Sequence, residues 1–341
     1  MAKRAGAAPG LLVNIREVMR TCNLPEGRRP DLISRWLILT RACVQPMTLT
    51  AAAIAGLLAA RAPGFRLELF AVAAVGIIVA HAANNLINDF FDLDLGQDTE
   101  SYPRALYAPH PVLSGMITRG GLLRAILVLN AVDVVILALL VVERGWPVAA
   151  FAVAGLFISV FYVAPPLRLK LHGLGEPSVF LIWGPLMVGG TYYAATGTLP
   201  GAVVWASLPY ALLVTSVLMG KHLDKAPWDR EQGVRTLPVL LGDRPARRFT
   251  VGLVVAFYAA VAAEVIAGIL PIWALAATAA LPQGVRLARI YGAPKPADPP
   301  EDYRVWPLWF VSWAFRHSRR AGALFVLGLA AGAVWPVFVG A

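Results

Sequence analysis

The chain has 341 residues, of which 58% are hydrophobic and only 15% are charged. Soluble domains carry about 25% charged residues, so this composition excludes a soluble globular protein and predicts an all-α, polytopic membrane protein. The formal net charge of +10 could indicate a nucleic-acid partner, but the basic residues lie in short loops between apolar runs, which membrane topology explains better. We therefore expect membrane lipids as partners and no nucleic acid.

The N-terminal segment is predicted to comprise residues 1–35 and to precede a membrane domain of residues 36–341. It does not read as a signal peptide, because Lys3 and Arg4 are followed by no clean apolar core and no small-residue cleavage site. Residues 11–18 carry apolar and arginine side chains at helical spacing. They could form an amphipathic helix that lies on an anionic membrane face.

Apolar runs long enough to cross a membrane, about seventeen to twenty-five residues, recur along the rest of the chain. They predict nine transmembrane helices, at residues 36–60, 67–88, 121–142, 146–163, 177–196, 201–220, 249–268, 269–288 and 321–340. With a cytoplasmic N-terminus, 26 of the 30 lysine and arginine residues fall in cytoplasmic segments or at the cytoplasmic ends of the spans. This follows the positive-inside rule and predicts a multi-pass protein of the inner (plasma) membrane, with its N-terminus and active-site loops cytoplasmic.

An acidic segment, residues 84–98, follows the second apolar run. Side chains with oxygen donors recur there at i, i+3, i+4 and i+7, on one face of a helix, with one more acid beyond: Asn85, Asn88, Asp89, Asp92 and Asp98. Carboxylates and amide oxygens gathered this way suit a hard divalent cation, above all Mg²⁺. The alternative is a solvated helix end just outside the membrane, although asparagine contributes less to solubility than lysine or glutamate would.

A second acidic motif follows the sixth apolar run. Asp224 and Asp229 are five residues apart, about 140° around a regular helix, and would not share a face. Pro227 disfavours helical geometry at Ala226, so we expect the helix to end there and Asp229 to lie on a loop that folds back. The two motifs could then each hold a metal ion, with an anion shared between them. His222 is a possible further ligand, but a lone histidine is more often a hydrogen-bonding neighbour.

Basic and phenolic side chains near the two motifs are candidates for binding a diphosphate. Arg168 and Lys170 either anchor a cytoplasmic loop or neutralise diphosphate oxygens, and the sequence leaves both readings open. Arg41 lies inside an apolar run, where a charge usually faces a polar cavity. The candidate diphosphate ligands are Arg41, Arg119, Tyr162, Arg168, Lys170, Lys221 and Lys225. Two acidic clusters, these cations and an apolar interior suit a diphosphate on a hydrocarbon tail.

The two cysteines, Cys22 and Cys43, match no metal-binding spacing and are predicted to be ordinary thiols. No Ser/His/Asp or Cys/His triad suggests itself, and no glycine-rich nucleotide loop is present. The aromatic segment that precedes the last apolar run, residues 306–315, is read as an interfacial anchor rather than a substrate contact.

Short motifs, each weak alone, follow one another in a specific order. They are Pro46-x-Thr48-Leu49, Asn88-Asp89-x-x-Asp92-x-x-x-Gly96-x-Asp98, Gly173-Leu174-Gly175-Glu176, Gly184-Pro185-Leu186, Gly190-x-Tyr192-Tyr193 and Gly233-x-Arg235-Thr236-Leu237-Pro238-Val239. In this order the chain resembles the UbiA superfamily of intramembrane prenyltransferases over nearly its whole length, and its menaquinone branch in particular. The resemblance implies nine helices around a central cavity.

The resemblance also implies Mg²⁺-dependent transfer of a polyprenyl group from a polyprenyl diphosphate to an aromatic acceptor, such as 1,4-dihydroxy-2-naphthoate in menaquinone biosynthesis. In this interpretation Asp92, Asp224 and Lys170 are catalytic. Asn88, Asp89, Asp92 and Asp98, with Asn85 beside them, hold one Mg²⁺, and Asp224 with Asp229 holds another. Alternatives are a different lipid or carotenoid acceptor, a UbiA-type terpene cyclase, or a transporter whose acids would lie near mid-membrane.

The chain departs from the family's pattern at two places. The second motif usually has a base followed by an acid four residues before its last aspartate, whereas here Asp224 precedes Lys225. Either Asp224 still reaches the second metal ion, or Lys225 binds phosphate directly. Gln45 stands where the family often has arginine, and Arg41, one turn earlier, is a possible replacement.

Overall fold

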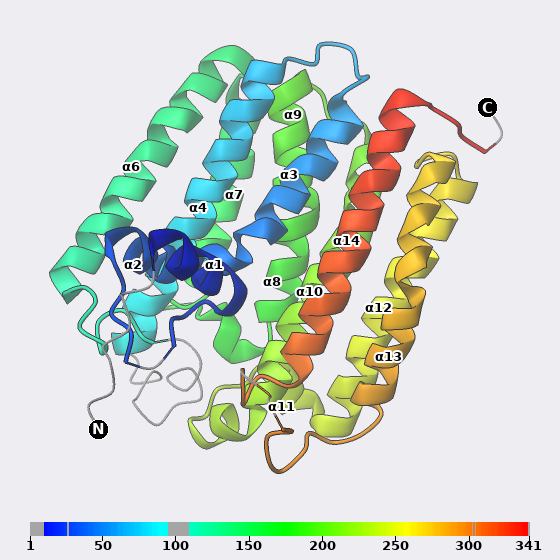
Figure 1. Cartoon of the computed structure of the whole chain (residues 1–341). Helices are drawn as coiled ribbons and strands as arrows, with labels where there is room; N and C mark the ends of the chain where they lie inside the picture. Colours follow the sequence, from blue (N-terminus) through cyan, green and yellow to red (C-terminus); the bar gives the residue numbers. More distant parts are fainter. Residues whose placement is uncertain (1–9, 26, 95–108, 302, 304, 340–341) are drawn as a thin grey trace.

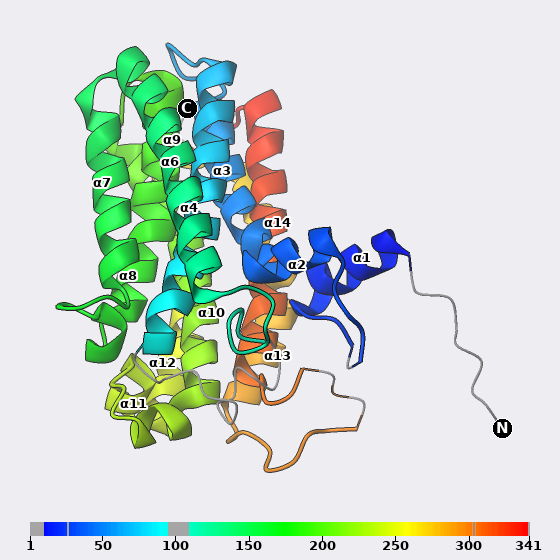
Figure 2. The same cartoon turned by 90° about the vertical axis from the view of Figure 1, so that its left-hand side faces the viewer.

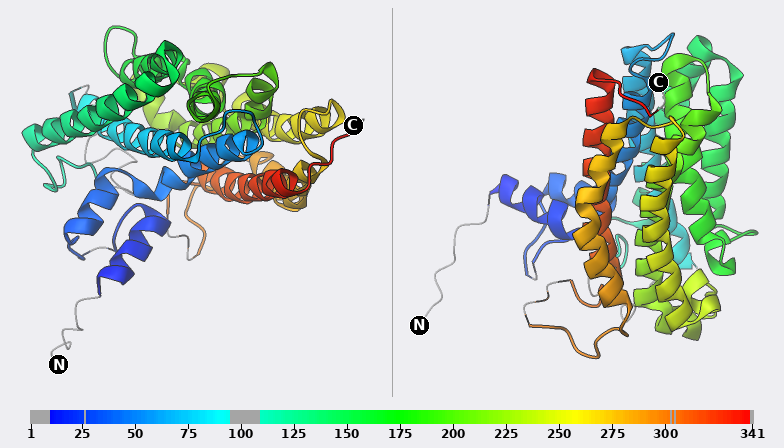
Figure 3. Two further views of the ribbon diagram at one scale, coloured as in Figure 1. Left: turned by 90° about the horizontal axis from the view of Figure 1, so that it is seen from above. Right: turned by 90° about the vertical axis from the view of Figure 1, so that its right-hand side faces the viewer.

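The computed structural model describes residues 10–25, 27–94, 109–301, 303 and 305–339, and every regular element in these ranges is helical. The long helices run side by side in one bundle (Figure 1). Two short helices, α1 (Leu11–Thr21) and α2 (Leu32–Leu39), project from the side of this bundle (Figure 2). Viewed from above, both lie outside its outline (Figure 3). The expected helix over residues 11–18 is therefore present, and its contact with a membrane stays a prediction.

The bundle itself is built from longer helices joined by short helical turns. In chain order these are η1 (Ala42–Val44), α3 (Gln45–Ala59), α4 (Leu67–Asp94), α6 (Arg119–Arg144), α7 (Trp146–Phe161), η2 (Leu169–His172), α8 (Gly175–Leu181), η3 (Ile182–Gly189), α9 (Gly190–Thr196), α10 (Gly201–Glu231), α11 (Leu237–Leu241), α12 (Asp243–Ile266), η4 (Ile272–Ala280), α13 (Leu281–Tyr291) and α14 (Phe310–Val334). The all-α class expected from the sequence is confirmed for the described chain.

Five segments of the described chain are long and apolar enough to cross a membrane: Ala42–Ala59, Leu67–Leu93, Arg119–Arg144, Gly201–Glu231 and Asp243–Ile266. They agree with a polytopic membrane protein, while the expected total of nine spans stays a prediction. The first apolar run is interrupted, because Arg41 adopts a left-handed conformation (φ 52°) that separates α2 from η1. The last helix begins at Phe310 rather than near residue 321, so part of the expected interfacial segment is helical.

The centre of the main core lies along α10, which contacts α3, α8, α12, α14 and η3. Buried side chains such as Tyr210 and Leu213 on α10 pack in one cluster with Phe257 of α12 and Phe325 of α14. A helix that is apolar on nearly all sides is expected at the centre of a bundle. The polar residues at the far end of α10 are therefore held on a rigid support.

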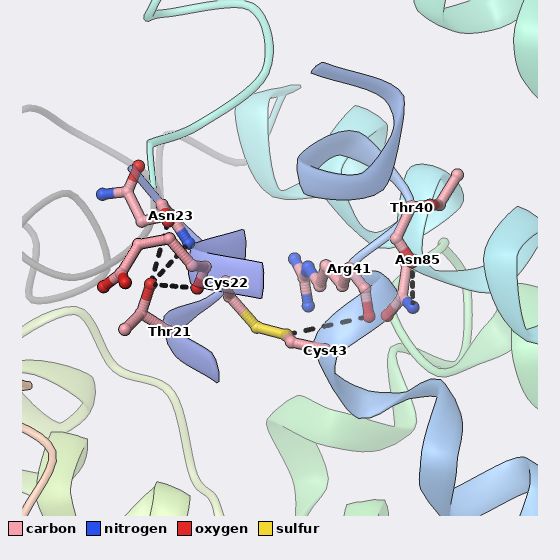
Figure 4. The surroundings of a disulfide bond; sticks show 8 residues. Thr21, Cys22, Asn23, Thr40, Arg41, Cys43 and Asn85 are labelled. Atoms are coloured by element: carbon pink, nitrogen blue, oxygen red, sulfur yellow. Dashed lines mark hydrogen bonds between the residues drawn. A yellow bond between two sulfur atoms is a disulfide. The ribbon is translucent and has the colours of Figure 1, made fainter. Parts of the chain in front are cut away.

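The prediction that both cysteines are ordinary thiols is wrong. Cys22, at the end of α1, and Cys43, in η1, are joined by a disulfide, with their Cα atoms 5.3 Å apart (Figure 4). The hairpin formed by α1 and α2 brings these residues together although they are 21 positions apart. Sequence spacing alone does not reveal such a pairing, because it depends on how the hairpin folds back.

Candidate functional site

The face of α4 that carries the first acidic motif is buried near the C-terminal end of the helix, with Asn85 4%, Asp89 0% and Asp92 7% exposed. The Nδ2 atom of Asn85 donates a hydrogen bond to the Thr40 carbonyl oxygen at 3.1 Å (Figure 4). One turn later, the Asp89 carboxylate forms an ion pair with Arg41. The helix spacing predicted for this motif is confirmed. The two contacts join Thr40 and Arg41, where α2 ends, directly to α4.

Lys170 pairs with Asp92, as its proposed place near the first motif would require. Its Nζ lies 3.0 and 3.2 Å from the two carboxylate oxygens of Asp92, and the lysine is 7% exposed. Lys170 is placed by the turn η2, which follows the left-handed Arg168 (φ 42°), and its backbone N–H donates to the Tyr162 carbonyl at 3.0 Å. In a buried ion pair of this kind, removal of either partner leaves the other charge uncompensated.

The second acidic motif has a different geometry from the one expected. The prediction that the helix ends near Ala226 is wrong, because α10 continues through Pro227 to Glu231. Proline removes one backbone hydrogen bond, but the surrounding contacts of α10 with α8, α11 and α12 hold this last turn in helical form. Asp224 and Asp229 therefore lie on one continuous helix and point in different directions.

Asp224 faces the beginning of α14. Its Oδ1 and Oδ2 atoms accept hydrogen bonds from the backbone N–H groups of Phe310 and Val311, each at 2.9 Å. The Nζ atom of Lys295 lies 3.6 Å from Oδ1. Through these two hydrogen bonds, the carboxylate of Asp224, which is 1% exposed, caps the positive N-terminal end of α14. This placement does not bring Asp224 together with the first motif.

Asp229 lies on the side of α10 that faces the first motif. The Tyr162 hydroxyl lies 3.2 Å and the His222 ring 3.6 Å from a Cβ atom built on Gly175, and Asp229 lies about 20° from His222 around α10. Tyr162 follows the end of α7. Lys170, which pairs with Asp92 of α4, donates its backbone N–H to the Tyr162 carbonyl, and His222 of α10 contacts Glu176 of α8, so the ends of α4, α7, α8 and α10 converge at this point.

Glu176 was not assigned a role from the sequence, although it belongs to one of the motifs that carried the resemblance. It is 1% exposed and its Oε1 lies 2.7 Å from Nδ1 of His222, which is equally buried. The reading of His222 as a hydrogen-bonding neighbour is therefore confirmed. The signal available in the sequence was an acid that directly follows a glycine-rich segment, Gly173-Leu174-Gly175.

The other expected diphosphate ligands lie on several different elements. Arg119 is exposed at the start of α6, with its guanidinium 5.0 Å from the centre of the Phe90 ring. Lys221 and Lys225 lie one turn apart on α10, and Lys225 is 5% exposed. Arg168 is half-buried, and its Nε has no hydrogen-bond partner among the described residues. Asp98 lies outside the described residues.

The residues on α4 fit a divalent cation better than those on α10 do. The Oδ1 atom of Asn88 is buried without a hydrogen-bond partner in the described ranges, one turn from the Asp92 carboxylate. An orphaned amide oxygen beside carboxylates is a donor set that Mg²⁺ accepts. Within those ranges, no group of three or more His, Cys, Asp or Glu side chains is arranged to hold a metal ion. On α10, both oxygens of Asp224 are already hydrogen-bonded.

An apolar cavity of about 260 Å³ adjoins this polar cluster. It is lined by α4, α6, α7, η3 and α9, and on α4 it extends from Ile87 back to Ala73, about 21 Å of helix. Phe151 and Trp183 contribute aromatic rings to its wall. Asn84 and Ser159, which share a hydrogen bond of 2.7 Å, line the end nearest the acidic motif. The arrangement suits a molecule with an anionic head and a long hydrocarbon tail.

Comparison with known proteins gives one family match, over residues 49–313, to the UbiA prenyltransferase family. UbiA prenyltransferase domain-containing protein 1 of Dictyostelium discoideum is 27% identical over 51% of this chain and 53% of its own length. Digeranylgeranylglyceryl phosphate synthase of Natronomonas pharaonis is 29% identical over 55% and 62%. 1,4-Dihydroxy-2-naphthoate octaprenyltransferase of Bacillus subtilis is 23% identical over 80% and 88%. The chain thus spans about half the length of the first of these relatives.

Two solved structures share the fold at low sequence identity. The apo structure of a UbiA homologue from Aeropyrum pernix K1 superposes with a TM-score of 0.64 at 20% identity, over 84% of this chain and 96% of that one. A UbiA homologue from Archaeoglobus fulgidus, bound to GPP and Mg²⁺, gives a TM-score of 0.57 at 15% identity, over 88% and 99%. At these identities the likeness concerns the fold alone.

Proposed function

Because the chain belongs to the UbiA prenyltransferase family, we propose that it transfers a prenyl group from a prenyl diphosphate to an acceptor within the membrane. The observation that carries this proposal is the burial of Asp92, Lys170 and Asp229 where the ends of α4, α7 and α10 meet, at one end of a long apolar cavity. An anionic head group would lie among the polar side chains, and the hydrocarbon tail would extend along the cavity.

The diphosphate is bound by the cations that already contact the acidic motif. Lys170 and Arg41 are paired with Asp92 and Asp89, and each can turn part of its donor set toward phosphate oxygens. Asn88, Asp89 and Asp92, with Asp98 beyond the described residues, would hold Mg²⁺. When bound there, Mg²⁺ supplies positive charge that stabilises the leaving diphosphate.

The reaction breaks the bond between the allylic carbon and the diphosphate oxygen, and the bonding electron pair leaves with the diphosphate. An electron pair of an acceptor carbon then forms the new carbon–carbon bond, and the acceptor loses a proton, or carbon dioxide if it carries a carboxylate at that carbon. Apolar walls keep water from the cationic carbon. The rings of Phe151 and Trp183 offer cation–π stabilisation along the same cavity.

We propose 1,4-dihydroxy-2-naphthoate as the acceptor, which would place the protein in menaquinone biosynthesis. The motifs that carried the resemblance to this branch support the choice, as does the likeness to the Bacillus subtilis octaprenyltransferase, which extends over 80% of the chain. A glycerol phosphate lipid is the second candidate, because the likeness to the Natronomonas pharaonis synthase covers 55% of the chain at 29% identity.

An acceptor panel tests this proposal. We would incubate the purified protein in detergent with Mg²⁺, geranylgeranyl diphosphate and one of four acceptors: dihydroxynaphthoate, hydroxybenzoate, a glycerol phosphate lipid or a carotenoid. Prenylated and decarboxylated naphthoate is the expected product. Prenylation of another acceptor would overturn the acceptor assignment but would leave the proposed prenyl-transfer activity in place. A hydrocarbon product formed from the diphosphate alone would identify a terpene cyclase instead.

We also propose a nine-span topology in an inner (plasma) membrane, with the acidic motifs at the cytoplasmic side. The concentration of lysine and arginine in the loops of one side supports it. So does the grouping of Asp92, Lys170 and Asp229 at neighbouring helix ends. A reporter fused after residue 94 and one fused after residue 66 are expected to give opposite locations.

Filling the cavity should shorten the prenyl chain that the protein accepts. Gly155 of α7 lines the cavity, and a Cβ atom built there meets no atom within 4 Å. In Gly155→Phe we expect turnover with geranylgeranyl diphosphate to fall at least tenfold more than turnover with geranyl diphosphate, because only the longer tail reaches the new ring. Gly252→Phe, at an equally open position of α12 away from the cavity, is the control. Equal losses with both diphosphates would contradict the placement of the tail.

A further inference from the structure

The second acidic motif presents two different faces of α10. Lys225 and Asp229 are four residues apart on this continuous helix, so they lie about 40° from one another. Asp224 precedes Lys225 by one residue and lies about 140° from Asp229. Only one of the motif's two carboxylates can therefore face the first motif, whichever way the helix is turned.

Contacts of α10 with α14 fix which face Asp224 occupies. Gly220 lies one turn before Asp224, and a Cβ atom built on Gly220 would be 2.9 Å from the backbone N and Cα of Val311. The same amide of Val311 donates to Asp224, as does that of Phe310. The α14 backbone packed against Gly220 and the two hydrogen bonds to Asp224 fix the rotation of α10 on this side. The Asp224 carboxylate is committed to the beginning of α14.

The opposite face of α10 points toward the ends of α7 and α8. His222 contacts Glu176 at 2.7 Å, and both the His222 ring and the Tyr162 hydroxyl lie within 3.6 Å of a Cβ atom built on Gly175. Lys225 falls about 60° from His222 and about 40° from Asp229, and it is 5% exposed. A buried ammonium group thus stands on the site-facing side, where the family's pattern would place a carboxylate.

We propose that Lys225 takes the place of the second metal ion, so that this chain binds its diphosphate substrate with one divalent cation, on α4, and with the ammonium of Lys225 on the side of α10. The inference rests on the proposed function. Lysine is a compact point charge with three donors and binds phosphate oxygens directly. A divalent cation within about 4 Å of that ammonium would be repelled, and Asp229 alone offers it a single carboxylate.

The number of metal ions bound per chain tests the inference without an activity measurement. We would titrate the purified full-length protein with Mn²⁺ in the presence of inorganic pyrophosphate, and follow free Mn²⁺ and Mn–Mn coupling by electron paramagnetic resonance. We expect one Mn²⁺ per chain and no coupling signal. In Lys225→Asp, which restores a carboxylate four residues before Asp229, we expect a second Mn²⁺ and a coupled signal. Arg230→Asp makes the same charge change at an exposed position of α10, and this variant should still bind one Mn²⁺ per chain.

A second variant keeps the test decisive if Lys225→Asp does not fold. In Lys225→Gln we expect one Mn²⁺ still, with pyrophosphate bound about tenfold to a hundredfold more weakly, because a charge-assisted hydrogen bond is lost. Unchanged pyrophosphate affinity would overturn the inference. Two Mn²⁺ in the unmodified chain, one of them lost in Asp224→Asn, would overturn it and leave the proposed function in place. No Mn²⁺ binding at all would overturn the proposed function as well.

Discussion

Asp92→Asn should lower prenyl transfer by about 10²- to 10³-fold while the protein stays folded. The carboxylate of Asp92 is 7% exposed and lies 3.0 Å from the Nζ of Lys170. The substitution removes one negative oxygen from the proposed cation site, and it leaves the Lys170 ammonium buried beside a neutral amide. Both changes act on the charge that develops as the diphosphate leaves. Initial rates with geranylgeranyl diphosphate and the preferred acceptor measure the effect.

Two further variants separate this effect from a general loss of structure. Glu231→Gln removes an exposed acid at the end of α10, and we expect its rate to remain within about twofold of the unmodified protein. We expect Lys170→Met to lose activity to a similar extent as Asp92→Asn. The double variant should lose little more activity than either single variant, because the two side chains form one contact. A rate for Asp92→Asn close to that of the unmodified protein would refute the site.

Asp224→Ala should destabilise the protein strongly. Two buried backbone amides, those of Phe310 and Val311, lose their acceptor, and Lys295 loses the carboxylate 3.6 Å away. Each buried amide left without a partner destabilises by about 1–3 kcal/mol, so we expect the free energy of unfolding to fall by about 2–5 kcal/mol. Thermal unfolding in detergent, followed by tryptophan fluorescence, should show a midpoint several degrees lower. Trp309 and Trp313, near the start of α14, are two of the ten tryptophans that contribute to that signal.

The comparison of Asp224→Ala with Asp224→Asn distinguishes a structural role from a metal ligand. Asparagine keeps one side-chain oxygen for the amides of α14, so its midpoint should lie between those of the alanine variant and the unmodified protein. Asp298→Asn, at an exposed position, should not change the midpoint. If Asp224→Ala unfolds at the same temperature as the unmodified protein, the contact with α14 contributes nothing, and the original assignment of Asp224 to a second metal ion regains its basis.

The first acidic motif could be predicted from the sequence because its geometry is local. Asn85, Asp89 and Asp92 share a face in any regular helix, and α4 is regular through Asp94. The partners of this face were only partly visible. Arg41 stood out as a cation inside an apolar run, whereas Lys170 was left open between a loop anchor and a diphosphate ligand; both form ion pairs with the motif. The pairing of Glu176 with His222 joins residues 46 positions apart, and no local pattern indicates it.

The second acidic motif shows where local reasoning fails. A proline favours the end of a helix, yet packing around α10 keeps Pro227 inside it. The direction of Asp224 depends on where α14 begins, which is set by contacts between distant segments. The disulfide between Cys22 and Cys43 depends in the same way on the α1–α2 hairpin.

By itself the sequence determined that this is a helical membrane protein, that its basic residues lie mostly between apolar runs, and that one helix face carries the oxygen donors. These properties follow from composition and from a period of 3.6 residues, both of which are readable along the chain. Only the tertiary structure decided that Asp229 faces the first motif while Asp224 caps α14, and that Lys225 lies on the site-facing side. Each of those outcomes depends on how α10 is rotated against its neighbours, and that rotation is set by packing rather than by sequence order.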